Sequence, residues 1–467
     1  MKKYLIIIFI VLLKWNGLKA EVKLPAIFGS GMVLQQKENV KVWGKAKNNA
    51  NLSIITSWDQ KTYIVKASAT GEWKTKISTP TAGGPYHITF NDGVKLVLND
   101  ILIGEVWLCS GQSNMEMPIK GFGNQPILNS NDILLDADEP GLRLFRIEKN
   151  MSKVPLNELS NKWEHTNATT VREFSAVGYQ FARMLQQKLK VPVGIIQSAY
   201  GGTDIEAWMT KKSLTGFSDF KVPADTAKVF KNDPAVLFNA MINPIIGFNI
   251  KGVLWYQGEN NRFNPLTYNK KMAAMVSDWR SLWNIGEWPF YYVQIAPNVY
   301  KDVKENIPLL YEAQARAAAL IPNSGMVVSV DAGSLTTIHP PDKTIISKRL
   351  LYWALAKTYG RVGVTFSGPV YKSLKINADK AIVAFDNIPL GLTAYGQKLI
   401  SFEIAGNDKI FYPAEAVISG KTVVVKSEKV TQPIAVRYAF KDSAAGNLYN
   451  VEGLPLGPFR SDDWGIQ

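Results

Sequence analysis

The sequence of 467 residues contains one cysteine and three histidines, and both scarcities limit what the protein can be. Because Cys109 is the only cysteine, no intrachain disulfide can form, and packing must stabilise the fold. The three histidines are His87, His165 and His339. Spread along the chain with a single cysteine, they do not make a zinc site, so metal-dependent hydrolysis is not expected.

Long apolar runs are absent after the first 20 residues, so no membrane-spanning segment is expected. The sequence also has no low-complexity tract, no clear repeat and no recognisable nucleic-acid-binding module. The net charge of +14 comes from scattered, not clustered, basic residues. This pattern fits contact with anionic glycans or simple solubility, and it gives no reason to expect nucleic acid as a partner.

The first 20 residues have the pattern of a secretory signal peptide. Lys2 and Lys3 precede an apolar run over residues 4–13, and Ala20 offers a small residue for cleavage before Glu21. The run is too short to span a membrane, and no cysteine for a lipid anchor lies near the cleavage point. We therefore expect an exported protein, periplasmic or extracellular.

The remaining chain exceeds the usual size of one hydrophobic core, and its patterning predicts several regions. Residues 21–100 contain short β-patterned runs separated by turns, which predicts a β-sandwich-like domain. Residues 101–363 alternate apolar runs with helical patterns, which predicts an α/β domain with a parallel, doubly wound sheet. Residues 364–467 return to β patterns and predict a β-rich C-terminal region.

The expected strands are residues 40–43, 52–56, 86–90, 101–109, 191–196, 251–256, 290–295, 325–330, 381–385, 422–425 and 435–438. The expected helices are residues 174–189, 266–282, 310–320 and 344–359.

One hydroxyl stands where the first strand of the α/β region ends. The apolar run 101–109 stops at the sequence Gly-Gln-Ser-Asn, which places Ser113 at the mouth of the sheet, where open α/β folds bind ligands. A serine in a tight turn after a strand is typical of the nucleophile in acyl-transfer enzymes. The alternative is an ordinary polar turn, and three later segments bear on that choice. Cys109, inside the apolar run, fits a small core residue better than a nucleophile.

Two of the later segments offer hydrogen-bond donors for an oxyanion. Gly201 and Gly202 follow a predicted strand, and their backbone N–H groups can point into a cleft that a substrate approaches closely. Gln257 and Asn260, on either side of Glu259, follow the next predicted strand and can each supply a neutral amide donor. The alternatives are a glycine turn that needs only a positive φ, and carboxamides that merely satisfy loop backbone.

The third segment contains His339, which follows the last predicted strand of the α/β region and precedes its last helix. This late position is where a serine hydrolase has its general base. His87 lies in a β-hairpin pattern and His165 in a polar stretch, so structural or solvated roles suit both. An isolated histidine is more often structural, but the company of Ser113 favours His339 as a base.

Four motifs resemble the blocks of the sialate O-acetylesterase family, which belongs to the SGNH hydrolases. They are Gly111-Gln112-Ser113-Asn114-Met115-Glu116, Gly201-Gly202-Thr203 with Glu206-Ala207-Trp208, Trp255-Tyr256-Gln257-Gly258-Glu259-Asn260, and Ile338-His339-Pro340 with Lys343. The resemblance extends over essentially the whole chain after residue 20. It implies an SGNH, flavodoxin-like α/β domain that removes acetyl groups from sugar hydroxyls without a metal or organic cofactor.

The resemblance also implies the steps of the reaction. Ser113 would attack the acetyl carbonyl, and His339 would take its proton and later protonate the leaving sugar oxygen. The Ser113 backbone N–H, an N–H of the Gly201–Gly202 loop and the Gln257 side chain would bind the oxyanion.

Substrate-binding roles are expected for Trp208, Glu259 and Asn260. A tryptophan offers a flat face to a sugar ring, although buried aromatic residues at such positions are as often part of a core.

One position departs from the family pattern. SGNH hydrolases commonly carry an aspartate three residues before the histidine, where this sequence has Thr336. In the Ser-His-Asp template, losing the charge that orients the histidine costs about 10⁴ in turnover. Either the enzyme uses a Ser-His pair aided by a backbone carbonyl, or another acid orients His339. Asp331, at the end of the preceding strand, is the nearest candidate, and Asp342 is the next.

The predicted function is that of an exported carbohydrate O-acetylesterase whose partner is an O-acetylated glycan, either sialic acid or a polysaccharide such as xylan or pectin. Two alternatives stay open. A glycan-binding protein with a decayed esterase domain would explain the missing aspartate. A lipid-directed SGNH esterase would need a long apolar groove. The sequence gives neither the sugar nor the oligomeric state.

Overall fold

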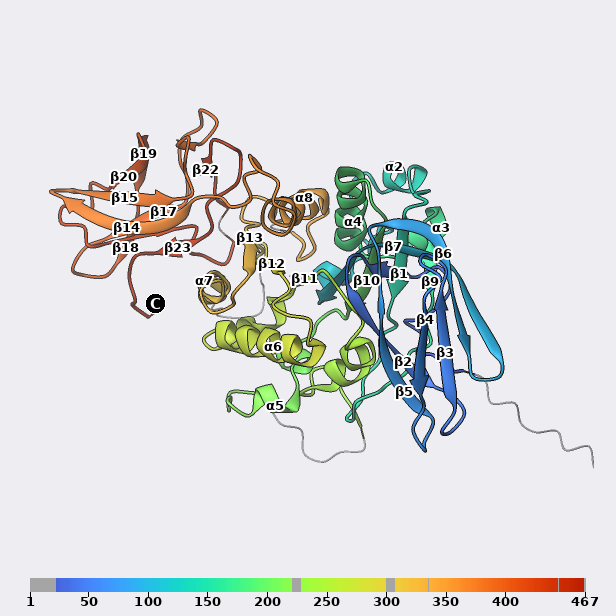
Figure 1. The fold of residues 1–467 in the computed structure, drawn as a ribbon. Coiled ribbons are helices and arrows are strands. Elements are labelled where there is room, and N and C mark those ends of the chain that lie inside the picture. Colours follow the sequence, from blue (N-terminus) through green and yellow to red (C-terminus); the bar gives the residue numbers. More distant parts are fainter. Residues whose placement is uncertain (1–21, 221–227, 300–306, 335, 444, 466–467) are drawn as a thin grey trace, which may run out of the picture.

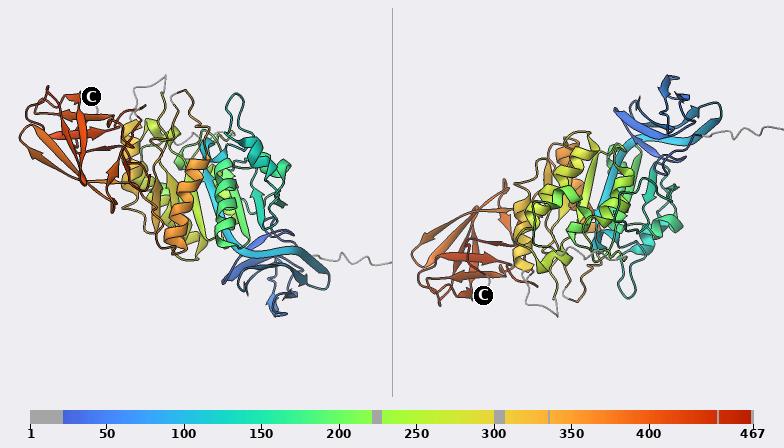
Figure 2. Two further views of the ribbon diagram at one scale, coloured as in Figure 1. Left: turned by 90° about the horizontal axis from the view of Figure 1, so that it is seen from above. Right: turned by 90° about the horizontal axis from the view of Figure 1, so that it is seen from below.

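The computed structural model describes residues 22–220, 228–299, 307–334, 336–443 and 445–465. It has a β-rich region at the N-terminal end, a central α/β body and a second β-rich region at the C-terminal end (Figure 1). Views from above and below show these parts in a row, with the α/β body in the middle (Figure 2). The predicted signal peptide, residues 1–20, lies outside the described residues.

The strands before and within the α/β body are β1 (Val33–Gln35), β2 (Asn39–Lys45), β3 (Asn51–Thr56), β4 (Thr62–Lys66), β5 (Glu72–Ser78), β6 (Gly83–Asn91), β7 (Lys95–Gly111), β8 (Leu142–Arg146), β9 (Trp163–His165), β10 (Val193–Ala199), β11 (Gly252–Tyr256), β12 (Phe290–Val293) and β13 (Ser324–Val327). The helices are α1 (Ser113–Glu116), α2 (Ser130–Leu135), α3 (Ala168–Arg172), α4 (Ala176–Leu189), α5 (Lys211–Leu214), α6 (Tyr268–Trp283), α7 (Ile307–Ala317) and α8 (Thr344–Trp353). The strands of the C-terminal region are β14 (Val370–Asn377), β15 (Lys380–Asp386), β16 (Leu392–Thr393), β17 (Phe402–Ala405), β18 (Phe411–Pro413), β19 (Glu415–Ser419), β20 (Thr422–Lys426), β21 (Ala435–Tyr438), β22 (Tyr449–Asn450) and β23 (Phe459–Arg460).

Parallel strands in the order β13, β12, β11, β7, β10 and β8 form the centre of the α/β body, and β9 adds an antiparallel strand beside β8. Alternate residues of these strands face opposite sides. On β7, Val106 and Leu108 pack in one cluster with side chains of α6 and α7, whereas Trp107 and Cys109 pack in another with side chains of α4 and α8. Helices therefore cover both faces of the sheet (Figure 1), as parallel strands buried on both sides require.

The predicted α/β core with β-rich regions before and after it is confirmed, and the predicted helices correspond to α4, α6, α7 and α8. The sequence patterns did not predict β8, the last of the parallel strands in this order. Arg143 interrupts its apolar pattern, yet this arginine is 3% exposed and pairs with Asp100 at 3.1 Å. Because the charge is neutralised inside the fold, the strand is buried without reading as an apolar run.

β7 has 17 residues and belongs to two parts of the molecule. Its first part, residues 95–103, pairs with β6, and residues 102–104 pair with β1. Its last part, residues 105–111, pairs with β10 and β11 in the centre of the α/β body. The strand therefore crosses the predicted domain boundary between residues 100 and 101 without interruption.

Each β-rich region packs its strands around its own apolar side chains. In the N-terminal region β2 pairs with β5, while β3 pairs with β4 and β6, and alternate residues of β2 and β3 are buried together. The described part of the C-terminal region contains two four-stranded antiparallel sheets, in the orders β14-β15-β20-β19 and β18-β17-β21-β23, which share one core, and a two-stranded antiparallel sheet of β16 and β22. Across the described ranges, no helix combines the length and apolar character needed to cross a membrane.

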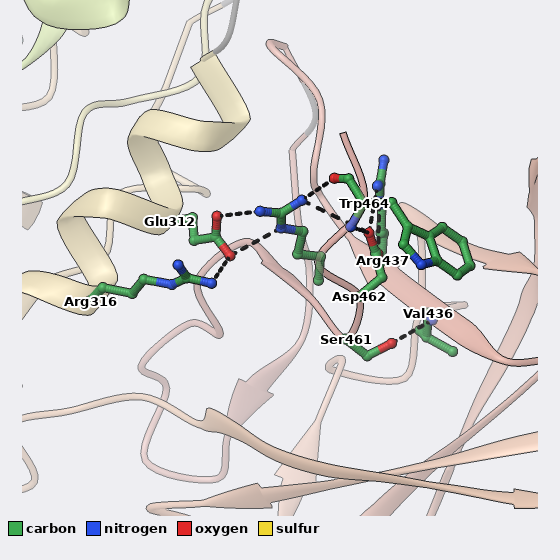
Figure 3. Close-up of polar contacts among 8 residues, drawn as sticks. Glu312, Arg316, Val436, Arg437, Ser461, Asp462 and Trp464 are labelled. Carbon is green, nitrogen blue, oxygen red and sulfur yellow. Dashed lines mark hydrogen bonds and ion pairs between the residues drawn. The ribbon is translucent and has the colours of Figure 1, made fainter. Parts of the chain in front are cut away.

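An ion pair between Arg460 and Glu312 connects the C-terminal region to α7 (Figure 3). Glu312 on α7 accepts two hydrogen bonds from Arg460 of β23, at 3.0 and 2.8 Å, and one from Arg316 at 2.8 Å. Arg437 of β21 pairs with Asp462 at 2.9 and 2.7 Å. The Glu312–Arg460 contact is thus a paired, two-bond interaction between the α/β body and the region that follows it.

We expect Arg460→Ala to lower the free energy of unfolding by about 1.5–3 kcal/mol, the usual effect of losing hydrogen bonds to a charged group. Arg316→Ala is the matched control, because it removes the other arginine from the same carboxylate. The Arg316 side chain is 62% exposed, so its loss should change stability by less than about 1 kcal/mol. Urea unfolding of both variants measures the difference, and equal losses would contradict the assigned role of Arg460.

Candidate active site

Ser113 lies where β7 ends at the carboxyl edge of the sheet. The strand finishes at Gly111, and Ser113 is the first residue of α1. Gly111 has a φ of +135°, and a Cβ on it would stand 2.1 Å from the Tyr256 carbonyl oxygen. Only glycine fits such a conformation and such a close approach. The neighbouring Gln112 N–H donates to the same carbonyl at 2.9 Å, which fixes the serine turn against β11.

A pocket of about 500 Å³ opens beside this turn. Six of the residues singled out in the sequence line it, namely Ser113, Gly201, Gly202, Glu259, Asn260 and His339. They come from loops after β7, β10, β11 and β13, which meet because the carboxyl ends of parallel strands share one edge of a sheet. The fold therefore brings a hydroxyl, an imidazole and amide groups around one cavity.

A tight turn over residues 121–125 holds the imidazole of His339. The Phe122 and Gln125 backbones exchange two hydrogen bonds of 3.0 Å, and Gly121 has a φ of +76°. The Gln125 side-chain oxygen contacts Nδ1 of His339, and the Phe122 ring lies edge-on to the imidazole with centroids 5.3 Å apart. A backbone bond from Leu128 to Pro341, at 3.1 Å, ties this segment to the histidine loop.

The other imidazole nitrogen, Nε2, is buried and has no hydrogen-bond partner among the described residues. Burial and, secondarily, the positive charge of Lys343 lower the pKa of His339 to about 4. The imidazole is therefore neutral at pH 7. With Nδ1–H donating to the Gln125 oxygen, Nε2 carries the lone pair that a general base needs.

The loop after β10 approaches the serine closely. A Cβ on Gly201 would lie 3.1 Å from the Ser113 Cβ, so a side chain there would crowd the hydroxyl. The Gly201 N–H donates to the Glu116 carboxylate at 2.5 Å, and Glu116 also pairs with Lys149 at 2.5 Å. Gly202 has a φ of +67°, a left-handed backbone conformation that favours glycine. The Gly201 N–H is thus occupied, whereas Gly202 lines the cavity.

A buried polar chain connects the serine turn to the histidine loop. Asn114 donates to Glu259 at 2.5 Å and to the Ile338 carbonyl at 3.1 Å, and it accepts from Lys343 at 2.5 Å. Burial lowers the pKa of Lys343 to about 7 and raises the pKa of Glu259. The neutral amide of Asn114 therefore lies between two buried ionisable groups and links the serine turn to the loop that carries His339.

Comparisons with known proteins identify the family of the chain. The family described as "Carbohydrate esterase, sialic acid-specific acetylesterase" matches residues 103–346, slightly more than half of the chain. The chain belongs to this family. It is therefore an esterase, and the resemblance to the sialate O-acetylesterase family that the four motifs suggested is confirmed.

Individual relatives agree with the family. The chain is 28% identical to the sialate O-acetylesterases of Homo sapiens and Pongo abelii over 414 residues, which cover 80% of this chain and 77% of each relative. The crystal structure of a carbohydrate acetylesterase from Xanthomonas citri is similar over 95% of this chain and 100% of its own, with a TM-score of 0.87 and 36% identity.

Two residues that the sequence placed at the site have other contacts in this esterase. Gln257 is fully buried, and its amide nitrogen donates to the Thr203 carbonyl at 2.9 Å and to Asn261 at 2.7 Å. Trp208 is also fully buried, with its indole N–H donating to the Thr203 hydroxyl at 3.0 Å. Both side chains donate to Thr203, the residue after the two glycines, and neither residue lines the pocket.

The two acids considered for orienting His339 are engaged elsewhere. Asp331 forms a two-bond ion pair with Arg349 of α8, both contacts being 2.7 Å. Asp342 accepts the Thr344 N–H at 2.9 Å and so caps the start of α8. Thr336, which stands at the family's aspartate position, is exposed and contacts Ser334. The group at Nδ1 is instead the neutral side chain of Gln125.

Gln125 was missed in the sequence because it precedes His339 by 214 residues and belongs to no periodic element. The available signal was the glycine- and asparagine-rich stretch 121–125, which marks a tight turn close after the serine motif. Cys109 is buried, and burial raises the pKa of its thiol, in keeping with a core residue. Within the described ranges, no group of three or more His, Cys, Asp or Glu side chains is arranged to hold a metal ion.

We expect Lys343→Met to raise the pKa of His339 above its value of about 4 in the original protein, because a positive charge that disfavours the imidazolium is removed. The pKa should stay below the ordinary value, since burial is the larger cause. Lys348→Met removes an equal charge from an exposed position on α8, five residues further along the chain, and should leave the pKa of His339 unchanged. NMR titration of the three histidines measures both variants, and equal shifts would contradict a local effect of Lys343.

Proposed function

We propose that this esterase is a serine-dependent O-acetylesterase that removes acetyl groups from sugar hydroxyls. The observation that carries the proposal is the shared pocket of Ser113 and His339, with Nδ1 of the imidazole held by Gln125 and Nε2 left without a partner among the described residues. The parallel sheet with helices on both faces supports assigning the α/β body to the doubly wound SGNH fold.

In the proposed reaction, Nε2 of His339 takes the proton of the Ser113 hydroxyl as its oxygen attacks the acetyl carbonyl carbon. The tetrahedral intermediate collapses, the bond from the acetyl carbon to the sugar oxygen breaks, and His339 returns the proton to that oxygen. A water molecule, deprotonated by the same imidazole, then attacks the acetyl-serine. Acetate leaves, and the serine hydroxyl is restored.

The oxyanion is proposed to lie between the Ser113 N–H, the Gly202 N–H and the Asn260 amide. Ser113 opens a helix, where the first N–H groups have no partner within the helix. Asn260 lines the pocket, and Asp204 holds its amide nitrogen at 2.5 Å, which leaves the second amide proton for the cavity. Asn260 therefore takes the donor role that the sequence assigned to Gln257, whose amide protons are both used inside the fold.

Gln125 is proposed to orient His339 in place of the usual aspartate. Its carbonyl oxygen accepts from Nδ1, which selects the tautomer with a free lone pair on Nε2. A neutral acceptor fixes this tautomer without adding a negative charge beside the imidazole. Turnover then depends on geometry and on the oxyanion donors more than on stabilising an imidazolium.

The substrate is proposed to be an O-acetylated carbohydrate. The relatives are named for sialate and for carbohydrate acetyl esters, and the pocket carries Lys149, Lys231 and Arg262 beside Glu116 and Glu259. Charged side chains of both signs suit a hydroxylated ligand and disfavour the acyl chain of a lipid. The presence of both Ser113 and His339 in one pocket favours an active enzyme over a binding protein with a decayed site.

Export is proposed from the N-terminal pattern, with cleavage after Ala20. A mature protein recovered from the periplasm or medium whose sequence begins at Glu21 would support it, and an uncleaved cytoplasmic product would contradict it.

We expect Ser113→Ala to lower acetate release by roughly 10³-fold or more. The substrates are O-acetylated sialic acids, acetyl-xylan, acetylated pectin fragments and 4-nitrophenyl esters of increasing chain length. Serine-dependent release restricted to acetyl esters would support the proposal, and the best glycan would define the substrate. Rising activity with acyl length would favour the lipid esterase, and no turnover by folded protein would favour the glycan-binding alternative.

A second set of variants tests the role of Gln125. Gln125→Ala should lower kcat by about 10²-fold through loss of imidazole orientation. Gln125→Glu should raise the pKa of His339, so the acidic limb of kcat/KM, near pH 4 in the original protein, should move up by about 1–3 pH units. The sign follows because the base acts when neutral, and activity is lost as the pH falls through its pKa.

Asp331→Asn is the control for these variants, since it removes the charge of the acid that most closely precedes His339 in the sequence. It should weaken the contact with Arg349 but leave kcat of the folded protein near its original value. A loss of turnover in Asp331→Asn as large as that in Gln125→Ala would overturn the assignment.

A further inference from the structure

A second cavity, termed here the neighbouring groove, lies beside the pocket of Ser113 and His339. It has a volume of about 450 Å³ and shares Glu116, Phe122 and Lys149 with that pocket. Ligand sites in proteins commonly measure about 300–1,000 Å³, so pocket and groove can each hold a sugar residue. The two cavities therefore lie side by side and have these three side chains as a common wall.

The floor of the neighbouring groove is formed by the carboxyl ends of β10 and β8. Ala199 of β10 pairs with Gly111 at the end of β7, and Gln197 pairs with Arg146 of β8. Since adjacent strands lie about 4.8 Å apart, the groove leads roughly 10 Å sideways from the serine turn. A ligand that fills both cavities would therefore extend along the edge of the sheet.

The walls of the neighbouring groove combine apolar side chains, among them Pro118 and Ile147, with charged side chains of both signs. They carry Glu116, Glu148 and Glu173 together with Lys120, Arg146 and Lys149. Lys120 pairs with Glu173 at 2.6 Å and Lys149 with Glu116 at 2.5 Å, so these side chains are held in defined positions. These donors and acceptors suit the hydroxyl groups of a sugar.

Gln197 adds a buried polar group to the floor. It is 4% exposed, and its side-chain oxygen accepts the Ser175 N–H at 2.8 Å. This bond fixes the carboxamide and leaves its amino end as the donor available to a ligand. Phe122, at the junction of the two cavities, offers a ring against which a sugar can pack.

We propose that the neighbouring groove binds the sugar residue next to the acetylated one, so that the enzyme acts on acetylated oligosaccharide or polysaccharide chains. This inference rests on the proposed function, because it places the acetyl ester at Ser113 and the adjoining sugar between β10 and β8. The second site contributes binding energy from a part of the substrate that does not react.

The test compares chain lengths. Mono-O-acetylated xylose, glucose and galactose are compared with xylobiose, cellobiose and lactose that carry the acetyl group on the same hydroxyl. In at least one series, kcat/KM for the disaccharide should exceed that for the monosaccharide by roughly five- to thirtyfold, the effect of one or two added hydrogen bonds. The Arg146→Ala and Lys120→Ala variants should each lose most of this gain while keeping the original rate on acetylated monosaccharides and 4-nitrophenyl acetate.

Lys188→Ala is the matched control, because Lys188 is exposed on the last turn of α4, away from the residues that line the groove. No gain from the second sugar in any series would overturn the proposal. An equal loss on mono- and disaccharides in Arg146→Ala would also overturn it. Ser113→Ala distinguishes failure of the groove proposal from failure of the proposed function. If acetate release from every substrate survives that change, the proposed function itself is wrong, whatever the effect of chain length.

Discussion

The position of Ser113 depends on one close backbone contact, between Gly111 at the end of β7 and Tyr256 at the end of β11. A side chain at Gly111 would collide with the Tyr256 carbonyl, so the two strands can end side by side only with glycine there. β7 also extends into the N-terminal region, which fixes its register from both ends. The loops after β10 and β11 converge on Ser113 because those strands flank β7.

Neutral amides do much of the positioning around this serine. Gln112 ties the turn to the loop after β11, Asn114 joins it to the histidine loop, and Gln125 holds the imidazole. A carboxamide both donates and accepts, and it carries no net charge that burial would penalise. An amide partner is compatible with a strongly desolvated histidine, whereas a carboxylate at Nδ1 would favour the imidazolium and compete with the proposed role of His339 as a base at neutral pH.

The residues at strand ends were predictable from the sequence, because apolar runs mark parallel strands and their carboxyl ends share an edge. This logic located Ser113, Gly201, Gly202, Asn260 and the β-rich regions. This logic failed where contacts with distant segments determine which of several residues close in sequence lies at the site. Gly258, at a φ of +155°, turns the chain so that Gln257 points into the core and Asn260 lines the pocket. Asp331 is the nearest acid before His339, but Arg349 on α8 binds it. No local pattern links residue 125 to residue 339.

The turn over residues 121–125 has consequences for both halves of substrate recognition. Through Gln125 it holds His339, the proposed base, and through Phe122 it contributes a wall to the pocket of Ser113 and to the neighbouring groove. The Phe122 ring also touches the imidazole edge-on. A substitution that reshapes this wall for a different sugar therefore changes the packing of His339. The shape of this junction and the proposed orientation of His339 therefore cannot vary independently, whereas Lys120 and Arg146 line the groove but not the pocket of Ser113.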